Sequence, residues 1–457
     1  MASGGDLFAA GAFLFSAMAG RRGKMRFCRL AAALPGLCGF LAASAQAQDL
    51  GSAIREGRPV IDLRLRHEAV DDAARPMGAD AVTLRARLGY ETGAWNGLSL
   101  QADFDQVWAL ADAYDSTRNG RSARAVVADP AMTALNRLQL TYAADSATRI
   151  VLGRQRLLIG NQRFIGNSGW RQHEQTFDGV SAVNGSVPGL TLTYAWLHRV
   201  NRVWGPEVPA VSSTVPAATG QASYFKSDSH VLDGVYTGVP GLRLEAYAVL
   251  LDLAAPSYAT LRAQQLAVAR LSTATIGGRG EYGFALAEGV AAKLNVEFAH
   301  QRDHAANPLR IGLNYWLGEG SLTWQGVTGL AGYEVLEGDG VVGFATPLAT
   351  LHAFNGWADM FLATPANGLR DFYLRLGTVI PADAVGLRSL APTIAWHDYR
   401  SDRLDAGLGS EWNVQAELAV DANASLLAKY ARYAGSGVAF GGFPDKSVFW
   451  LQASYRY

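Results

Sequence analysis

Short segments in which apolar and polar residues strictly alternate recur along the chain, and they restrict its fold more than any other feature. The clearest segments are residues 60–68, 83–91, 98–105, 242–248, 293–298 and 411–418. Such alternation places the apolar side chains on one face of a β-strand and the polar side chains on the other. The segments are about ten residues long, which is the length of a strand that crosses a membrane. The polar positions carry charges of both signs, which favours a barrel with a charged lumen and an apolar outer face.

We expect an all-β fold, a transmembrane antiparallel β-barrel of about 18 strands, with 16 as the alternative. Short connections are expected near residues 93–97, 144–147, 187–189, 238–241, 287–289, 318–320 and 421–423. Longer connections are expected at residues 107–133, 160–175, 201–227, 253–273, 336–367 and 434–445. This alternation is typical of outer-membrane barrels, which have short periplasmic turns and long outer loops. One expected turn, residues 381–391, is longer than this rule predicts.

The first 47 residues have the pattern of a secretory signal peptide. Met25 is followed by basic residues, by an apolar run from Leu30 to Ala43, and by the small-x-small motif that ends at Ala47. The apolar run has about 14 residues, fewer than the roughly 20 needed to span a bilayer. We therefore expect residues 1–47 to be cleaved, with either Met1 or Met25 as the true start, and residues 48–457 to form one barrel domain.

The end of the chain and the distribution of cysteines agree with this location. Phe449, Leu451, Tyr455 and Tyr457 share one face of the last expected strand, and a terminal aromatic residue on an apolar face looks like the recognition signal of bacterial outer-membrane barrels. Both cysteines lie within residues 1–47, so the mature chain has no disulfide framework and no thiolate metal site. We expect no cofactor, no metal ion and no catalytic group.

Three stretches resemble the alginate-export family of outer-membrane proteins. They are GRQRLLIGNQRFIGNSGWRQHEQTFDGV (residues 153–180), GFATPLATLHAFNGWADMFLATPANGLRDFYLRLG (residues 343–377) and, more weakly, WHDYRSDRLDAGLGSEWNV (residues 396–414). The resemblance implies an 18-stranded barrel whose arginine-containing pore passes anionic polysaccharide. Carried over by motif, the pore-associated residues are Arg154, Arg156, Arg163 and Asp178.

Strand alternation gives a second set of candidate pore-lining residues. They are Arg64, Arg66, Arg85, Arg87, Asp103, Asp105, Arg243, Glu245, Arg279, Glu281, Lys293, Glu297 and Arg375. Fixed guanidinium groups can offset the hydration energy that an anion loses in a narrow pore. The mixed signs indicate that carboxylates hold the arginines in place, and the alternative is that these ion pairs only brace the barrel wall.

The long connection at residues 336–367 is unusually apolar for an outer loop. It contains Phe344, Leu348, Leu351, Phe354, Trp357, Met360 and Phe361. A solvated loop would not carry so many apolar side chains. We expect a short helix from Leu348 to Leu362 and a loop that folds into the barrel and narrows the pore; the alternative is a cap packed on neighbouring loops.

These features favour a passive outer-membrane channel for anionic saccharides or similar organic anions. Two other functions remain open: an uptake porin for small organic nutrients, and a membrane-anchored enzyme or adhesin on a closed barrel. The expected partners are outer-membrane lipid, an anionic saccharide or small organic anion, and periplasmic secretion partners, with no role for nucleic acid.

Overall fold

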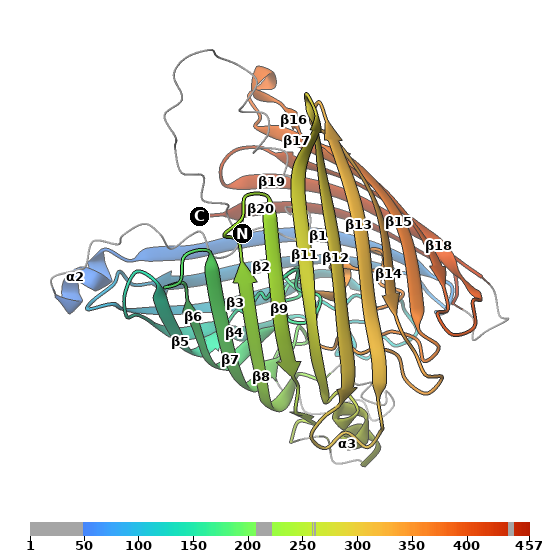
Figure 1. Ribbon diagram of the computed structural model, residues 1–457, viewed down its shortest axis with the longest axis horizontal. Helices are drawn as coiled ribbons and strands as arrows, with labels where there is room; N and C mark the ends of the chain where they lie inside the picture. Colours follow the sequence, from blue (N-terminus) through green and yellow to red (C-terminus); the bar gives the residue numbers. More distant parts are fainter. Residues whose placement is uncertain (1–48, 207–221, 258, 260–261, 437–442) are drawn as a thin grey trace.

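The chain forms one closed antiparallel β-barrel. In this computed structural model the described residues are 49–206, 222–257, 259, 262–436 and 443–457. The predicted signal peptide, residues 1–47, lies outside them. Each long strand pairs antiparallel with its neighbours, and the first strand pairs with the last over Asp62–Asp72, which closes the wall. Figure 1 shows the strands slanting around this wall.

The described residues contain 18 long strands, which confirms the expected fold class. They are β1 (Arg58–Asp72), β2 (Ala79–Glu91), β3 (Leu98–Ala113), β4 (Met132–Ala143), β5 (Thr148–Gln155), β6 (Thr176–Asn184), β7 (Leu190–Asn201), β8 (Tyr224–Tyr236), β9 (Leu242–Leu250), β11 (Thr273–Ala287), β12 (Val290–Asp303), β13 (Gly312–Trp324), β14 (Val327–Leu336), β15 (Leu369–Thr378), β17 (Ser389–Arg400), β18 (Gly407–Ala419), β19 (Ala424–Gly435) and β20 (Lys446–Arg456).

Short elements lie at the two ends of the barrel. They are two-residue strands β10 (Leu253–Ala254) and β16 (Ile380–Pro381), helices α2 (Leu50–Arg55) and α3 (Arg262–Ala269), and 3₁₀ turns η3 (Leu351–Ala353) and η4 (Asp383–Val385). Helix α2 precedes β1 on the side of the short turns, and α3 lies in a long loop on the other side. None of the described helices has the length and apolar character required to cross a membrane.

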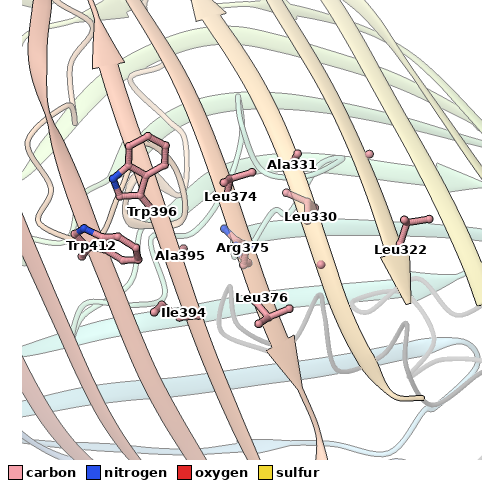
Figure 2. Close-up of a pocket in the computed structure, with 12 residues that line it drawn as sticks. Leu322, Leu330, Ala331, Leu374, Arg375, Leu376, Ile394, Ala395, Trp396 and Trp412 are labelled. Atoms are coloured by element: carbon pink, nitrogen blue, oxygen red, sulfur yellow. The ribbon is translucent and has the colours of Figure 1, made fainter. Parts of the chain in front are cut away.

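The alternation in sequence becomes an alternation between the two faces of the wall. On β15, Leu374 and Leu376 point outward, and Arg375 between them faces the lumen (Figure 2). Small residues such as Gly329 and Ala331 leave a shallow apolar hollow of about 500 Å³ on this outer face. On β20 the predicted aromatic face, including Phe449, is likewise exposed on the outside. In a closed barrel the backbone groups of each strand form hydrogen bonds with the neighbouring strands, so that a barrel with an apolar exterior can be embedded in lipid.

Two local expectations were wrong. The turn expected at Gly318–Gly320 lies within β13, and the chain reverses at Gln325 and Gly326, whose φ angles are 48° and 81°. Positive φ at both central residues is what a two-residue hairpin turn requires, whereas the glycines at 318 and 320 are extended. The connection expected to be long at residues 107–133 is also shorter, because β3 continues to Ala113.

The helix expected from Leu348 to Leu362 is also absent, and only the three-residue turn η3 forms there. Asn355, Gly356 and Asp359 all adopt positive φ, which a right-handed helix cannot contain. The long turn expected at residues 381–391 is shorter, because β16 extends to Pro381 and β17 begins at Ser389, with η4 between them.

Adjacent positions on β18 test the assignment of the two faces. We expect Val414→Arg to weaken folding into vesicles by about 2–4 kcal/mol, because Val414 faces outward near the middle of the strand. Gln415→Arg is the matched control, since residue 415 faces the lumen and its new charge can remain hydrated. The measurement is a urea titration in lipid vesicles, and an equal loss for both variants would contradict the assignment.

Candidate functional site inside the barrel

Two long loops enter the lumen and join each other there. They are residues 156–175, between β5 and β6, and residues 337–368, between β14 and β15; we call them the 156–175 loop and the 337–368 loop. The Gly166 amide donates to the Leu348 carbonyl at 2.9 Å, and the Thr350 amide donates to the Gln162 carbonyl at 3.0 Å. The Gln175 side chain donates to the Leu348 carbonyl at 3.1 Å. The two loops therefore form one hydrogen-bonded unit.

Arginines on β1 and β2 hold the 156–175 loop against the wall. Arg64 Nη1 lies 3.1 Å from each of the carbonyl oxygens of residues 169, 170 and 171. Arg66 Nη2 donates to the Trp170 carbonyl at 2.6 Å, and Arg85 Nη1 donates to the Gln172 carbonyl at 3.2 Å. A loop lacks the hydrogen bonds of a strand, and a guanidinium can donate five. These arginines thus supply partners that the loop backbone could not find in the lumen.

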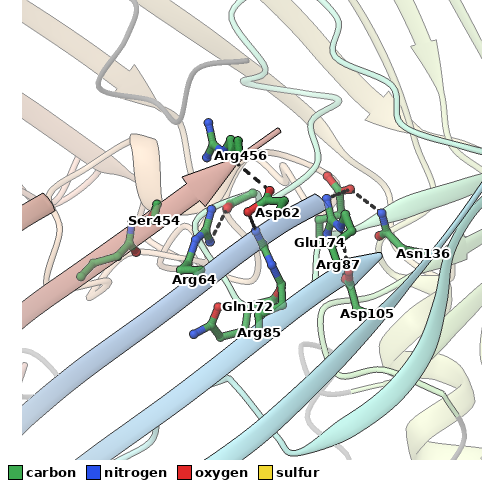
Figure 3. A network of polar contacts seen from close by, with 12 residues as sticks. Asp62, Arg64, Arg85, Arg87, Asp105, Asn136, Gln172, Glu174, Ser454 and Arg456 are labelled. Atoms are coloured by element: carbon green, nitrogen blue, oxygen red, sulfur yellow. Dashed lines mark hydrogen bonds and ion pairs between the residues drawn. The ribbon is translucent and has the colours of Figure 1, made fainter. Parts of the chain in front are cut away.

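Glu174 lies beside Arg87 and Asn136 in one part of the polar network that Figure 3 shows. Its carboxylate receives Arg87 Nη1 at 2.7 Å, Arg156 Nη2 at 2.6 Å and the Asn136 side-chain amide at 2.9 Å. Burial alone would raise the pKa of Glu174, but Arg156 and Arg87 outweigh burial and hold the pKa well below its ordinary value. Glu174 is therefore a permanent anion that ties the loop to β2 and β4.

Three inward-facing residues, one each on β14, β18 and β19, hold the 337–368 loop. Glu411 Oε1 accepts the amides of Trp357 at 2.5 Å and Ala358 at 2.9 Å. Glu334 Oε2 accepts the Asn355 side chain at 2.6 Å, and Lys429 Nζ lies 2.8 Å from His352 Nε2. The loop thus packs inside the barrel, as the sequence predicted, and not only on its neighbouring outer loops.

The two loops are also joined through side chains. Arg163 of the first loop forms an ion pair with Glu334 at 2.9 Å and donates to Asn355 of the second loop at 2.9 Å. Arg171 forms an ion pair with Asp359 at 2.8 Å. These bonds join segments that are 192 and 188 residues apart in sequence.

A buried aromatic cluster lies where the loops meet β19 and β20. The rings of Trp170 and His352 stack with centroids 4.5 Å apart, and Lys429 Nζ lies 4.2 Å from the centroid of Trp170. His352 Nδ1 lies 2.8 Å from Asp359. Burial lowers the pKa of His352 to about 3, and the nearby Lys429 ammonium acts in the same direction, against the effect of Asp359. A neutral His352 fits both contacts, because Nδ1–H can donate to Asp359 while Nε2 accepts from Lys429.

The remaining predicted residues on the arginine-rich wall lie in ion pairs. Asp103 pairs with Arg137 at 2.8 Å, and Asp105 pairs with Arg87 at 2.7 Å. Arg154 contacts Asp178 through two hydrogen bonds of 2.7 and 2.9 Å.

The other predicted residues lie on a separate stretch of wall, from β9 to β15. Arg243 pairs with Glu245 at 2.9 Å, and Glu281 pairs with both Arg279 and Lys293. Glu297 accepts a hydrogen bond from the Tyr247 hydroxyl at 2.7 Å, and Arg375 faces the lumen on β15. The structure therefore separates the predicted residues into two groups and does not assemble them into one site.

Several residues of this region were not among the predicted site residues. Glu334, Glu411 and Lys429 lie at inward strand positions that alternation could have indicated. His173, Glu174 and His352 lie in loops, where no periodicity shows which way a side chain points.

The fold is that of an outer-membrane porin. OpdK of Pseudomonas aeruginosa, solved with vanillate, shares 15% identity, and the match covers 88% of this chain and 99% of that one at a TM-score of 0.63. OccK3 (OpdO) of the same organism shares 16%, with 90% and 98% covered and a TM-score of 0.64. OccAB2 of Acinetobacter baumannii shares 15%, with 89% and 99% covered and a TM-score of 0.65. The protein is accordingly a β-barrel of the bacterial outer membrane.

The family resemblance seen in the sequence is confirmed over part of the chain. Residues 60–194 match the model of the family described as alginate export. The first quoted stretch, residues 153–180, lies within the match, and the two later stretches lie outside it. No curated protein matches the sequence. The family and the structural neighbours are outer-membrane channels and not enzymes.

Glu411 provides a test of how the 337–368 loop is held. We expect Glu411→Ala to leave the buried Ala358 amide without an acceptor, and the Trp357 amide with only a 3.4 Å contact to Asn413 Oδ1, at a cost of about 1–3 kcal/mol, so that the loop detaches more often. Single-channel recordings should then show more frequent current fluctuations than those of the wild type. Gln415→Ala, on the same strand and face, is the control and should behave as the wild type. If the current of Glu411→Ala fluctuates no more often than that of the control, Glu411 does not hold the loop.

His352 predicts a dependence on pH. The pKa of His352 falls from about 6.5 in the unfolded chain to about 3 in the fold. As far as it depends on this group, the free energy of unfolding is therefore highest above pH 6.5 and decreases as the pH falls toward 3. At pH 5 the loss is about 2 kcal/mol. Current fluctuations of the wild type should rise between pH 7 and pH 5, and His352→Gln should reduce this rise. Equal pH dependence in both proteins would show that another group is responsible.

Proposed function

We propose that the protein is a passive channel that favours small organic anions. The observation that carries this proposal is the charge of the inner wall formed by β1–β7 and the 156–175 loop. Arginines dominate this wall, and not all of them are neutralised by a carboxylate. Arg64 bonds to backbone carbonyls, and Arg199 donates to the Asn201 side chain at 3.0 Å. The excess positive charge would lower the barrier for an anion in a narrow, low-dielectric passage.

The two inner loops favour small solutes over polymers. They cross from one wall to the other, and residues around them such as Asp105, Asn136 and Glu411 are fully buried. Where the loops lie, protein atoms fill part of the lumen, so that a narrow path is expected. The structural neighbour OpdK was solved with vanillate, an aromatic carboxylate, and its likeness to this chain is one of fold.

Export of anionic polysaccharide is the second candidate. The match of residues 60–194 to the alginate-export model favours it. An exporter would need the inner loops to admit a chain of sugars, and periplasmic secretion partners would be expected to deliver that chain.

Conductance measurements in planar bilayers would test the proposal. With the mature protein in a gradient of sodium glucuronate, we expect a reversal potential that shows preferential passage of glucuronate over sodium. A uronate oligosaccharide should block the current without crossing. Passage of the oligosaccharide would favour the exporter, whereas a pore without charge preference, or no conductance from folded protein, would refute the proposal.

A further inference from the structure

A polar cavity of about 320 Å³ lies beside the inner loops, near the outer ends of β4, β5 and β7. Its lining includes Arg154, His173, Arg199, Asn201, Arg202 and Ser223. This volume is at the lower end of the range for small-molecule sites. Three guanidinium groups border one small space, and none of the described residues that line it carries a carboxylate.

The three arginines differ in how their charges are compensated. Arg154 is held by both oxygens of Asp178. Arg199 donates to Asn201, and its Cζ lies 3.5 Å from the ring centroid of Tyr224. Within the described part of the chain, Arg199 forms no ion pair with a carboxylate.

Arg202 is the least compensated of the three. Only 8% of it is exposed, the one hydrogen bond of its side chain among the described residues is a long contact of 3.4 Å to the Pro347 carbonyl, and its Cζ lies 4.7 Å from the ring centroid of Phe225. Burial lowers the pKa of Arg202 to about 10, which still leaves the guanidinium charged at neutral pH. A buried cation without an anion is costly, and among the described residues no carboxylate forms an ion pair with Arg202.

We propose that this cavity is a binding site for the carboxylate of a small organic anion, with Arg199 and Arg202 as its ligands. The inference deepens the proposed function and rests on it. A guanidinium matches a planar carboxylate with two parallel hydrogen bonds, and the rings of Tyr224 and Phe225 fix the planes of the two guanidinium groups. The cavity volume fits one sugar acid or aromatic acid and not a chain of them. Bound in this cavity, a solute would lie beside the inner loops.

Calorimetric titration of the refolded mature protein with sodium glucuronate, and with glucose as the neutral counterpart, tests this site. We expect glucuronate to bind and glucose not to bind. Arg199→Gln and Arg202→Gln should each weaken glucuronate binding about tenfold. Arg202→Lys should be intermediate, because it keeps the charge and loses the two-pronged geometry. Arg310→Gln is the control, since Arg310 is almost fully exposed and lies outside the cavity, and it should bind as the wild type does.

The outcomes separate the site from the function. Unchanged binding in both glutamine variants, or glucose binding as strong as glucuronate binding, would overturn the site. If the wild-type channel still prefers glucuronate in bilayers, the proposed function survives that result. If the wild type shows no anion preference but the variants lose binding, the site stands and the transport role fails. Retention of the β-sheet circular dichroism spectrum confirms that each variant is folded.

Discussion

Everything inside this barrel depends on one constraint: a loop that enters the lumen must find hydrogen-bond partners for its backbone groups. A strand in the wall satisfies its amides and carbonyls through its neighbours, and a loop has no such neighbours. The protein meets this need with charged side chains that reach inward from the wall. Arg64 and Arg66 donate to carbonyls of the 156–175 loop, and Glu411 accepts amides of the 337–368 loop. The guanidinium groups donate to carbonyls and the Glu411 carboxyl group accepts from amides, and the bonds of the guanidinium groups are strengthened by their charge.

This arrangement explains why so many charged residues are buried in the lumen. The carboxylate of Glu174 and the guanidinium of Arg163 have exposed fractions of only a few per cent, and each would be costly without a partner. Paired as they are, they fix the loops instead of destabilising the fold. The alternative raised by the sequence, that ion pairs brace the wall, therefore describes much of the arginine set, and the cavity at Arg199 and Arg202 is where positive charge remains available.

The strands of the barrel wall could be predicted from the sequence, whereas the contacts of the loops and side chains inside the lumen could not. Alternation with period two fixes which face each strand residue takes, so that Arg85 and Leu374 could both be placed without a structure. Turns were harder, because glycine alone does not mark one: Gly318 and Gly320 are extended, and the turn falls at Gln325 and Gly326. The pairing of side chains inside the lumen could not be predicted from the sequence, since Arg163 contacts Glu334 only once the barrel has closed. The apolar composition of the 337–368 loop did indicate that it folds inward, although positive φ at Asn355 prevents the expected helix.

The central claim is that the 337–368 loop narrows the channel, and shortening it tests this most directly. The backbone of Gly343 lies against the Pro365 carbonyl, so residues 344–364 can be replaced by a two-glycine linker with little disturbance of the strands. The measurement is the single-channel conductance of this folded variant beside the wild type under the same salt. We predict a clearly larger conductance for the shortened protein. An unchanged conductance would contradict the account, because the narrowest part of the path would then lie elsewhere.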